Sequence, residues 1–286
     1  MQRRSALVAL VLLTAGCTGS SGAPVAINGS PASAPPGSAA SAGATASASP
    51  SASGTAARAV YYLHDAGHAP RLYREFHRRP ATTAVIRDAV AAMLSEKAYD
   101  GDYTSLWPAG TTVRGARVSG TTAYVDLSRE ARNGNAGAES EAASLQQLVY
   151  TVTAAAPAVH SVQLLIDGTT VETLWGHVDT RRPMTRQAAA EILGPVWLLV
   201  PRSLKAGARF GGEASVFEAT VSWEFRQGGR VVKAGFSNAS TGAPGRGAWS
   251  GVAAVPPGDY VLRAFESSAK DGTATFVDDK AVTVTG

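Results

Sequence analysis

The pattern of hydrophobic and polar positions divides the chain into four stretches, and the first is a leader. An uncharged apolar run from Ser5 to Leu13 follows Arg3 and Arg4 and passes into small residues before Cys17. A positive start, a short apolar run and small residues are typical of a secretory signal. The run is far shorter than the roughly 20 residues that span a bilayer. Residues 1–16 are therefore predicted to be a signal peptide, and the rest of the chain to be exported.

The second stretch has almost no hydrophobic pattern. Residues 18–57 consist almost wholly of Ala, Ser, Gly, Pro and Thr, and no charged residue occurs between Arg4 and Arg58. Such a composition cannot bury enough apolar surface to offset the entropy of ordering. We predict that residues 17–57 form a disordered tether, and about 40 residues of flexible chain span roughly 35 Å.

The third stretch, residues 58–184, alternates between strand and helix periodicity. Apolar residues recur at helical spacing in two segments, and Pro157 ends the second of them. Other segments alternate with period two, as half-buried strands do. The predicted order is strand, helix, hairpin, helix, strand, at residues 59–63, 85–94, 112–127, 138–156 and 159–166. Residues 64–70 read as a loop after the first strand. Two helices on one face of a small mixed sheet account for this pattern.

The fourth stretch is rich in strand patterns. Residues 185–195 have a helical composition that ends in Gly194-Pro195, and are predicted to be a short connecting helix. Residues 217–225 alternate apolar and polar side chains more regularly than any other segment, and Gln227 to Arg230 read as a turn. Further short strands with Pro- and Gly-containing turns follow. Residues 196–286 are therefore predicted to form an all-β sandwich of immunoglobulin type, and the fold class is α+β.

Two segments resemble known families. The first resemblance rests on Val60 to Leu63, Leu106 to Thr111, Ala123 to Ser128, Leu145 to Leu148, and Val162 to Gly168. In order and spacing these resemble the GerMN domain of sporulation and spore germination proteins, across about residues 58–186. The resemblance implies a compact α/β module of exported or lipid-anchored envelope proteins, with no known catalytic centre.

The second resemblance covers about residues 196–284. It rests on Gly212, Phe217 to Ala219, Val221, Trp223, Gly229, Val231, Val232, Gly235, Gly247 to Trp249, Tyr260, and Phe265 to Ser268. These residues are similar to Gmad2, an immunoglobulin-like domain that often follows GerMN. The two resemblances, in the expected order, support each other.

The only cysteine lies where a lipid anchor would be attached. Cys17 directly follows Ala15-Gly16, and this arrangement resembles the lipobox of bacterial lipoproteins, although Thr14 replaces the favoured leucine. The resemblance implies that Cys17 is lipidated and that the protein lies on the extracytoplasmic face of the cell membrane. The alternative is an ordinary secretory signal with a free thiol. A diacylated cysteine holds two acyl chains, which is enough for a stable membrane anchor.

Composition narrows the function further. The formal net charge of +4 falls to near +2 once Arg3 and Arg4 leave with the signal peptide, which is too small to indicate a nucleic-acid partner. With Cys17 lipidated, a disulfide, a catalytic thiolate and a cysteine metal site are all excluded. We expect no cofactor and no small-molecule cofactor site.

No residue stands out as catalytic or metal-binding. His64 and His68 are four residues apart, but Gly67 and Pro70 indicate a loop, where the two side chains would not share a helix face. His77, His160 and His177 have no carboxylate or cysteine at a matching spacing. The sequence has no Gly-x-Ser-x-Gly motif. We therefore expect no catalytic centre and no metal site.

Tryptophans and arginine supply the only binding candidates. Trp223 is predicted to be a core residue, because its neighbours at two-residue spacing are apolar. Trp107, which precedes Pro108, is also predicted to be a core residue. Trp249 follows the glycine-rich loop from Ser237 to Gly247, which also carries Arg246, and this end of the sandwich is a candidate interaction surface.

The sequence predicts a non-enzymatic, lipid-anchored envelope protein of the kind associated with sporulation or germination, which acts as an interaction or scaffold module. Its expected partners are the membrane, through the anchor, and envelope proteins or wall polymers. Two alternatives stay open. The first is a module that binds wall glycan through Trp249, and the second is a hydrolase with His64 or His177 beside a carboxylate.

Overall fold

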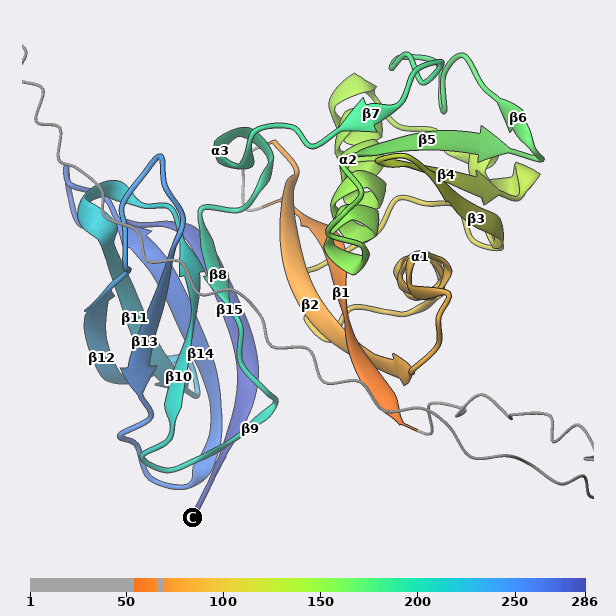
Figure 1. Ribbon diagram of the computed structural model, residues 1–286. Coiled ribbons are helices and arrows are strands. Elements are labelled where there is room, and N and C mark those ends of the chain that lie inside the picture. The colour runs from red at the N-terminus through yellow and green to blue at the C-terminus, as the bar shows by residue number, and fades with distance from the viewer. Residues whose placement is uncertain (1–53, 66–68) are drawn as a thin grey trace, which may run out of the picture. The chain divides into compact units, whose positions relative to one another are not determined.

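The computed structural model in Figure 1 describes residues 54–65 and 69–286. The predicted signal peptide, Cys17 and residues 18–53 of the predicted tether lie outside the described residues. All described residues belong to one compact unit. No helix among them is long and apolar enough to span a membrane.

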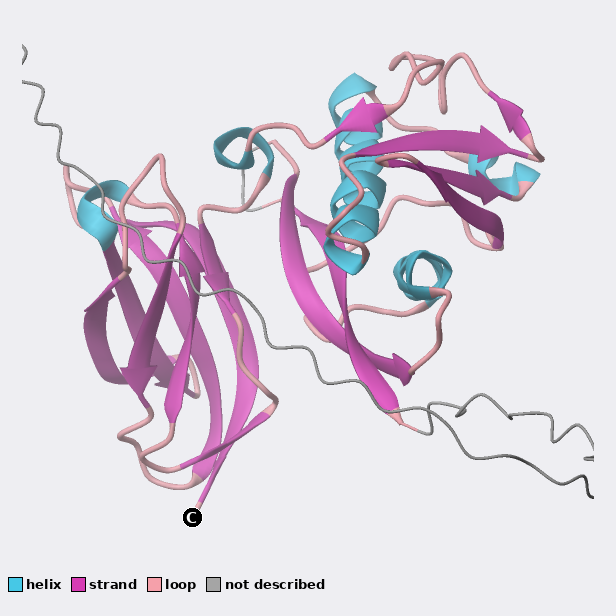
Figure 2. Ribbon diagram, in the orientation of Figure 1, coloured by secondary structure: helices cyan, strands magenta, loops and turns pink. Residues whose placement is uncertain are grey.

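The first part of the described chain is built of two β-hairpins, two long helices and a few short strands. Its elements are β1 (Thr55–His64), β2 (Arg71–Pro80), α1 (Val85–Ser95), β3 (Val113–Ser119), β4 (Thr122–Leu127), η1 (Arg129–Asn133), α2 (Ala138–Ala155), β5 (Ser161–Ile166), β6 (Thr169–Thr170) and β7 (Met184–Thr185). Figure 2 shows that the long helices belong to this part.

The predicted mixed sheet is present. Its strand order is β3-β4-β5-β6, with β7 also paired to β5. β3 and β4 form the predicted antiparallel hairpin, whereas β4 and β5 run parallel, with Val125 opposite Leu164. The long crossover that a parallel pair needs is supplied by η1 and α2.

The helices lie between the mixed sheet and the β1–β2 hairpin (Figure 1). Because α2 is covered on more than one side, it buries polar residues such as Glu141, Gln147 and Thr151 together with its apolar stripe. A helix that faced solvent along one side would have left these positions exposed.

The first strand differs from the prediction. It begins at Thr55, three residues inside the predicted tether, and it pairs with β2 and not with the mixed sheet. β2 itself was not predicted. Its sequence, RLYREFHRRP, is dominated by charge, yet Tyr73, Glu75 and His77 are buried with the alternation of a strand. Polar residues on the buried face conceal the usual hydrophobic pattern.

The connecting helix is much shorter than predicted. α3 covers only Ala189–Ile192. Thr185 is already extended in β7, and Leu193 is extended again. A residue that precedes proline disfavours helical geometry, and this applies to Gly194. Gly194 also lies against the ring of Tyr73, where any Cβ atom would overlap it.

The second part is the predicted β-sandwich. Its elements are β8 (Val196–Leu198), β9 (Ser203–Lys205), β10 (Arg209–Ala214), η2 (Phe217–Ala219), β11 (Thr220–Gln227), β12 (Arg230–Asn238), β13 (Gly247–Val252), β14 (Gly258–Ser267) and β15 (Ala274–Thr285). One sheet has the order β13-β10-β8 and the other β12-β11-β14-β15-β9. Together with the first part this confirms the α+β fold class.

The sandwich core contains Val221, Trp223 and Phe225 from β11, as the alternation predicted. Phe217 is an exception, because it precedes the strand and is 67% exposed. Glu218 and Ala219, which follow it, have φ angles of 52° and 57°, and this left-handed backbone interrupts the alternation.

The two parts share buried residues. Trp197 of β8 is 1% exposed and belongs to the hydrophobic core of the first part, as do Ile192 and Leu193. Its indole N–H donates to the carbonyl of Leu72 at 3.1 Å. The first core therefore extends beyond the segment that resembles GerMN.

Candidate binding groove

A groove of about 1050 Å³ lies where the two parts meet. It is bounded by β2, by the loop of residues 99–102, by residues 198–202, and by β14 and β15. Three exposed apolar side chains line it: Phe76 at 49%, Tyr99 at 51% and Val261 at 40% exposed. Concave, largely apolar sites at the junction of two modules are common binding sites.

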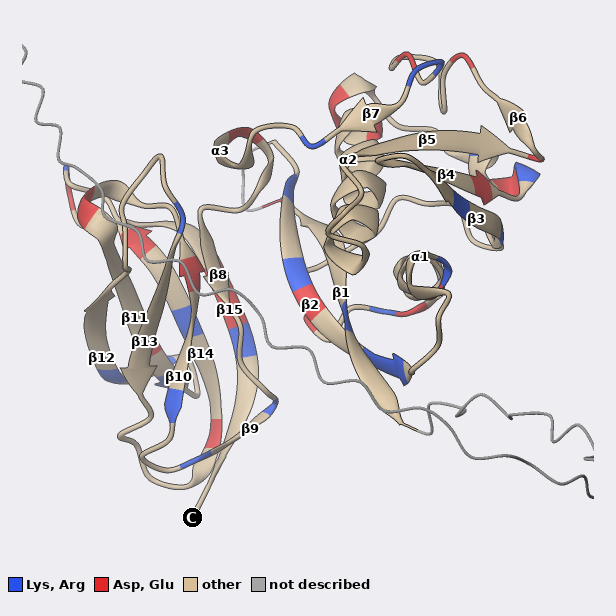
Figure 3. Ribbon diagram, in the orientation of Figure 1, with Lys and Arg blue, Asp and Glu red and all other residues tan. Residues whose placement is uncertain are grey.

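β2 positions the side chains on one wall of the groove. Glu75 and His77 point into the first part, and Arg74 and Phe76 alternate with them. The guanidinium of Arg74 lies 5.1 Å from the ring centroid of Phe76 and pairs with Glu213 at 2.5 Å. Figure 3 shows blue and red segments along both β2 and β15, so charge borders the groove from both parts.

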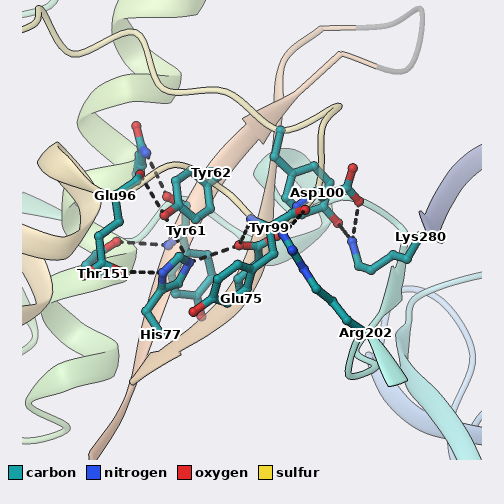
Figure 4. Close-up of polar contacts among 12 residues, drawn as sticks. Tyr61, Tyr62, Glu75, His77, Glu96, Tyr99, Asp100, Thr151, Arg202 and Lys280 are labelled. Carbon is teal, nitrogen blue, oxygen red and sulfur yellow. Dashed lines mark hydrogen bonds and ion pairs between the residues drawn. The ribbon is translucent and has the colours of Figure 1, made fainter. Parts of the chain in front are cut away.

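A buried network holds this wall in place (Figure 4). His77 is 1% exposed and lies between two carboxylates, 3.0 Å from Glu75 and 2.5 Å from Glu96. Burial alone would lower the pKa of His77, but its hydrogen bonds to Glu75 and Glu96 and their charges outweigh burial, and the pKa is raised. The tyrosine hydroxyl of Tyr62 lies 3.2 Å from the same imidazole.

The network reaches the groove through Glu75. Its carboxylate accepts the backbone N–H groups of Tyr99 at 2.8 Å and Asp100 at 2.9 Å. Burial would raise the pKa of Glu75, but the hydrogen bonds from His77, Tyr99 and Asp100 outweigh it and lower the pKa. The ring of Tyr99 stacks on His77 with an interplanar angle of 9° and a centroid distance of 4.3 Å. The half-exposed ring of Tyr99 is therefore held in place by the buried hydrogen-bonded network.

A second network joins the two parts beside the groove. Lys280 of β15 lies 2.5 Å from Asp100 and 3.2 Å from Asp278, and Tyr103 donates to Asp278 at 2.9 Å. Asp278 also accepts the N–H of Leu198 at 2.6 Å. Burial raises the pKa of Asp278 to about 6 despite these partners, whereas Asp278 and Asp100 outweigh burial and raise the pKa of Lys280. These charges hold the two parts together and are not free for a ligand.

The predicted binding residues Arg246 and Trp249 do not lie at a free surface. Trp249 is 4% exposed and packs in the sandwich core, edge to face with Phe210. Its strand, β13, directs this side chain between the sheets. Arg246 stacks on Trp197 at 4.4 Å and donates to the carbonyl of Gly194 at 2.6 Å. Both side chains serve packing, and burial lowers the pKa of Arg246. Trp223 and Trp107 are core residues, as predicted.

The histidines are separated. His64 lies beside the carbonyl of Asp102, and His68 is outside the described residues. His160 is exposed beside a smaller hollow. His177 does lie 2.9 Å from the carboxylate of Glu141. That carboxylate is fully buried and also accepts the backbone N–H groups of Leu174, Trp175, His177 and Val178, so it organises a loop. Among the described residues no group of three or more metal-ligating side chains occurs.

Sequence reasoning missed the groove residues on β2 and in the loop of residues 99–102. Glu75 and His77 are two apart, and this spacing places them on the same face of a strand. This spacing was visible in the sequence, but it becomes informative only once residues 71–80 are recognised as a strand. The pairing of Glu96 with His77 could not be found from spacing, because it depends on how α1 packs.

The comparisons agree with these two parts. The family model described as sporulation and spore germination (Germane) matches residues 59–172, and the immunoglobulin-like domain of bacterial spore germination (Gmad2) matches residues 202–273. No curated protein sequence matches the chain.

Several solved structures are similar at low identity. The first GerMN domain of the sporulation protein GerM from Bacillus subtilis is 21% identical, with a TM-score of 0.39, and the match covers 46% of this chain and 98% of that one. A Clostridium perfringens protein described as a lipoprotein is 18% identical, with a TM-score of 0.34, over 46% of this chain and 88% of that one.

The two family models match the two parts of the fold in chain order. The chain carries a GerMN domain of the sporulation and spore germination family, followed by a Gmad2 immunoglobulin-like domain.

Proposed function

We propose that this protein is anchored by lipid at Cys17 to the extracytoplasmic face of the membrane. There it holds another envelope component in the groove, without catalysis, in a process related to sporulation or germination. The observation that supports this best is the groove itself, in which half-exposed Tyr99 and Phe76 stand on a rigid, hydrogen-bonded wall. Rigid aromatic side chains in a concave site are the usual anchors of binding energy.

The state of the histidines favours binding over hydrolysis. A general base must have a free nitrogen within reach of a substrate proton. Both ring nitrogens of His77 are occupied by carboxylates, and the imidazole is almost fully buried. The carboxylate beside His177 is engaged by backbone N–H groups. His77 therefore presents no base to a substrate, and His177, whose Nδ1 contacts Glu141 and whose side chain is 45% exposed, does not line the groove.

Photocrosslinking in living cells tests the binding role. A photoreactive phenylalanine analogue replaces Tyr99 in one variant, and Val118 of β3 in a matched control. The two positions are equally exposed, at 51% and 50%, but Val118 does not line the groove. We expect a recurrent adduct from position 99 only. Equal adducts from both positions, or none from position 99, would contradict the proposal.

The anchor has its own test. Cys17→Ala removes the thiol that would be acylated, and we expect the protein to move from the membrane fraction to the medium. Continued retention in the membrane fraction would show that Cys17 is not the anchor.

Wall glycan is a second candidate for the component bound. Tyr99 favours it, because its half-exposed ring is fixed by stacking on His77 and has the guanidinium of Arg202 5.3 Å from its centroid, and an aromatic ring beside a hydrogen-bond donor suits a sugar. Retention on purified sacculi would then fall with Tyr99→Ala and persist with Val118→Ala. If the wild-type protein is not retained, this candidate is excluded.

A further inference from the structure

The backbone of the β1–β2 hairpin indicates what kind of ligand the groove takes. In an antiparallel pair, each residue directs its N–H and C=O to the same side, and successive residues alternate. Leu63 exchanges both groups with Thr104 at 2.8 Å, and its partner Leu72 accepts the N–H of Gly194 at 3.0 Å. The pair formed by Leu63 and Leu72 therefore points out of the hairpin.

The same alternation fixes the direction of the next residues. The register of β1 and β2 runs without a shift from Thr55 to His64. On β2, residues Arg74, Phe76 and Arg78 share the parity of Leu72, so their N–H and C=O groups also point away from β1. Arg74 and Phe76 line the groove, whereas Arg78 does not.

The two edges of the hairpin are treated differently. On β1, Tyr61 lies opposite Arg74, and its edge is closed by α2: Gln147 donates to its carbonyl at 2.7 Å, and its N–H donates to Thr151 at 3.3 Å. On β2, the backbone groups of Arg74 and Phe76 have no partner among residues 54–65 and 69–286. We call these two residues the open edge of β2.

β15 presents a similar edge on the other side of the groove. The N–H of Thr283 donates to Arg202 at 2.8 Å, on the side where β9 pairs. By alternation, Asp279 and Ala281 point to that same side, but β9 starts opposite Thr283 and does not reach them. Both residues line the groove, and within the described part of the chain their backbone groups have no partner.

The charged side chains of the groove indicate which charge an extended ligand would carry. Its lining carries the carboxylates of Glu75, Asp100, Asp102, Asp259 and Asp279, against the cationic side chains of Arg74, Arg202 and Lys280. Glu75, Asp100 and Lys280 are consumed in the internal networks. The Asp102 carboxylate is exposed and has no partner within the described residues, and Asp279 has only a long contact to Arg263 at 3.8 Å. A cationic side chain would complement these groups, whereas a phosphate polymer would be repelled.

We propose that the groove binds an extended polypeptide segment of a partner envelope protein, which adds a strand to the open edge of β2 and places a lysine or arginine beside Asp102 and Asp279. Main-chain hydrogen bonds to Arg74 and Phe76 would supply affinity, and alternate side chains would contact Phe76, Tyr99 and Val261. This inference rests on the proposed function and specifies its ligand.

The test uses the full chain in detergent and a defined probe. The probe is an acetylated, amidated heptapeptide of sequence TVKVKVT, and its comparison peptides are TVEVEVT and TVKVKVT methylated on the backbone nitrogens of the two lysines and the central valine. We expect TVKVKVT to bind at least tenfold more tightly than either of the others. Amide exchange of Arg74 and Phe76 should slow on binding, whereas that of Glu75 and His77, which bond within the hairpin, should not change.

Two proline variants separate backbone pairing from folding. Phe76→Pro removes an N–H that points into the groove, and edge strands tolerate proline at such positions. Arg78→Pro removes an N–H of the same parity outside the groove and is the matched control. Phe76→Ala keeps the N–H and removes the ring. We expect Phe76→Pro to weaken binding at least tenfold, Phe76→Ala less, and Arg78→Pro less than twofold.

Several outcomes would overturn the inference. They are equal binding of the methylated peptide, binding without protection of Arg74 and Phe76, equal effects of the two proline variants, or no peptide binding at millimolar concentration. If the peptide fails while position 99 still crosslinks to glycan in cells, strand addition is wrong and the proposed groove function stands. If position 99 gives no adduct at all, the proposed function fails first.

Discussion

The two edges of the β1–β2 hairpin have the same geometry and opposite environments. The β1 edge faces α2 and the loop before β3, and internal partners bond its backbone at Tyr61 and Leu63. The β2 edge is bonded at Leu72, by Gly194 and Trp197, and is open at Arg74 and Phe76. Native proteins usually cover or charge an unpaired edge. The difference teaches that opposite Tyr61, where α2 bonds the β1 edge, the β2 edge is left open at Arg74, a residue that lines the groove.

The largest expected effect comes from the bonded end of β2. Trp197→Ala removes a fully buried indole, its hydrogen bond to Leu72 and its stacking with Arg74 and Arg246. We expect a loss of about 3–5 kcal/mol in the free energy of unfolding, measured by chemical denaturation. Val118→Ala, at an exposed site, should change it by no more than about 0.5 kcal/mol. A similar small loss for both would show that Trp197 does not hold the two parts together.

The second-largest effect is expected from a substitution that removes a hydrogen bond to the β1 edge. Gln147→Ala leaves the carbonyl of buried Tyr61 without its donor, and we expect a loss of about 1–3 kcal/mol. Gln146→Ala is the neighbouring control, since that side chain bonds an exposed loop and should cost less. Equal losses would mean that α2 does not close the β1 edge.

The pH dependence of the free energy of unfolding tests the buried network of His77, Glu75 and Glu96 behind the open edge. The pKa of His77 is raised in the folded state, so the folded protein binds this proton more tightly than the unfolded chain. The resulting stabilisation is fully present below the unfolded pKa of about 6.5 and is lost as pH rises through the folded pKa. We therefore expect the stability of the wild type to fall above pH 6.5 relative to that of His77→Gln. Parallel stability curves for the two proteins would contradict this assignment.

The smallest expected effect is at the open edge itself. Phe76 is half exposed, and Phe76→Ala should change the free energy of unfolding by no more than about 0.5 kcal/mol. Thermal or chemical denaturation checks it. A loss well above 1 kcal/mol would show that the side chain is structural, and the contrast between the two edges would then not reflect ligand binding.

Much of the fold could be predicted from the chain because its periodicities are local. The alternation in β11, the stripe on α2 and the hairpin of β3 and β4 all follow from residues close in sequence. β2 could not be found this way, since its buried face carries Glu75 and His77, whose partners lie at Glu96 and Tyr99. Buried polar groups are stabilised by tertiary partners, and a hydrophobic pattern does not record them.

The predicted binding residues Trp249 and Arg246 are packed within the protein for a related reason. Trp249 and Arg246 follow a glycine-rich loop, which is common at binding surfaces. The register of β13 with β10 instead turns Trp249 into the sandwich core. Arg246 stacks on the ring of Trp197. The strand register decides whether a side chain at the end of a loop faces the core or the solvent, and the sequence of the loop does not specify that register.

The position of Trp197 also has an evolutionary consequence. It lies between the two family matches, in a segment that neither model covers, yet it completes the core of the GerMN domain. A gene fusion or truncation that cut between residues 172 and 197 would leave the first module without part of its interior. Exchanging one module alone would therefore require the junction to be rebuilt.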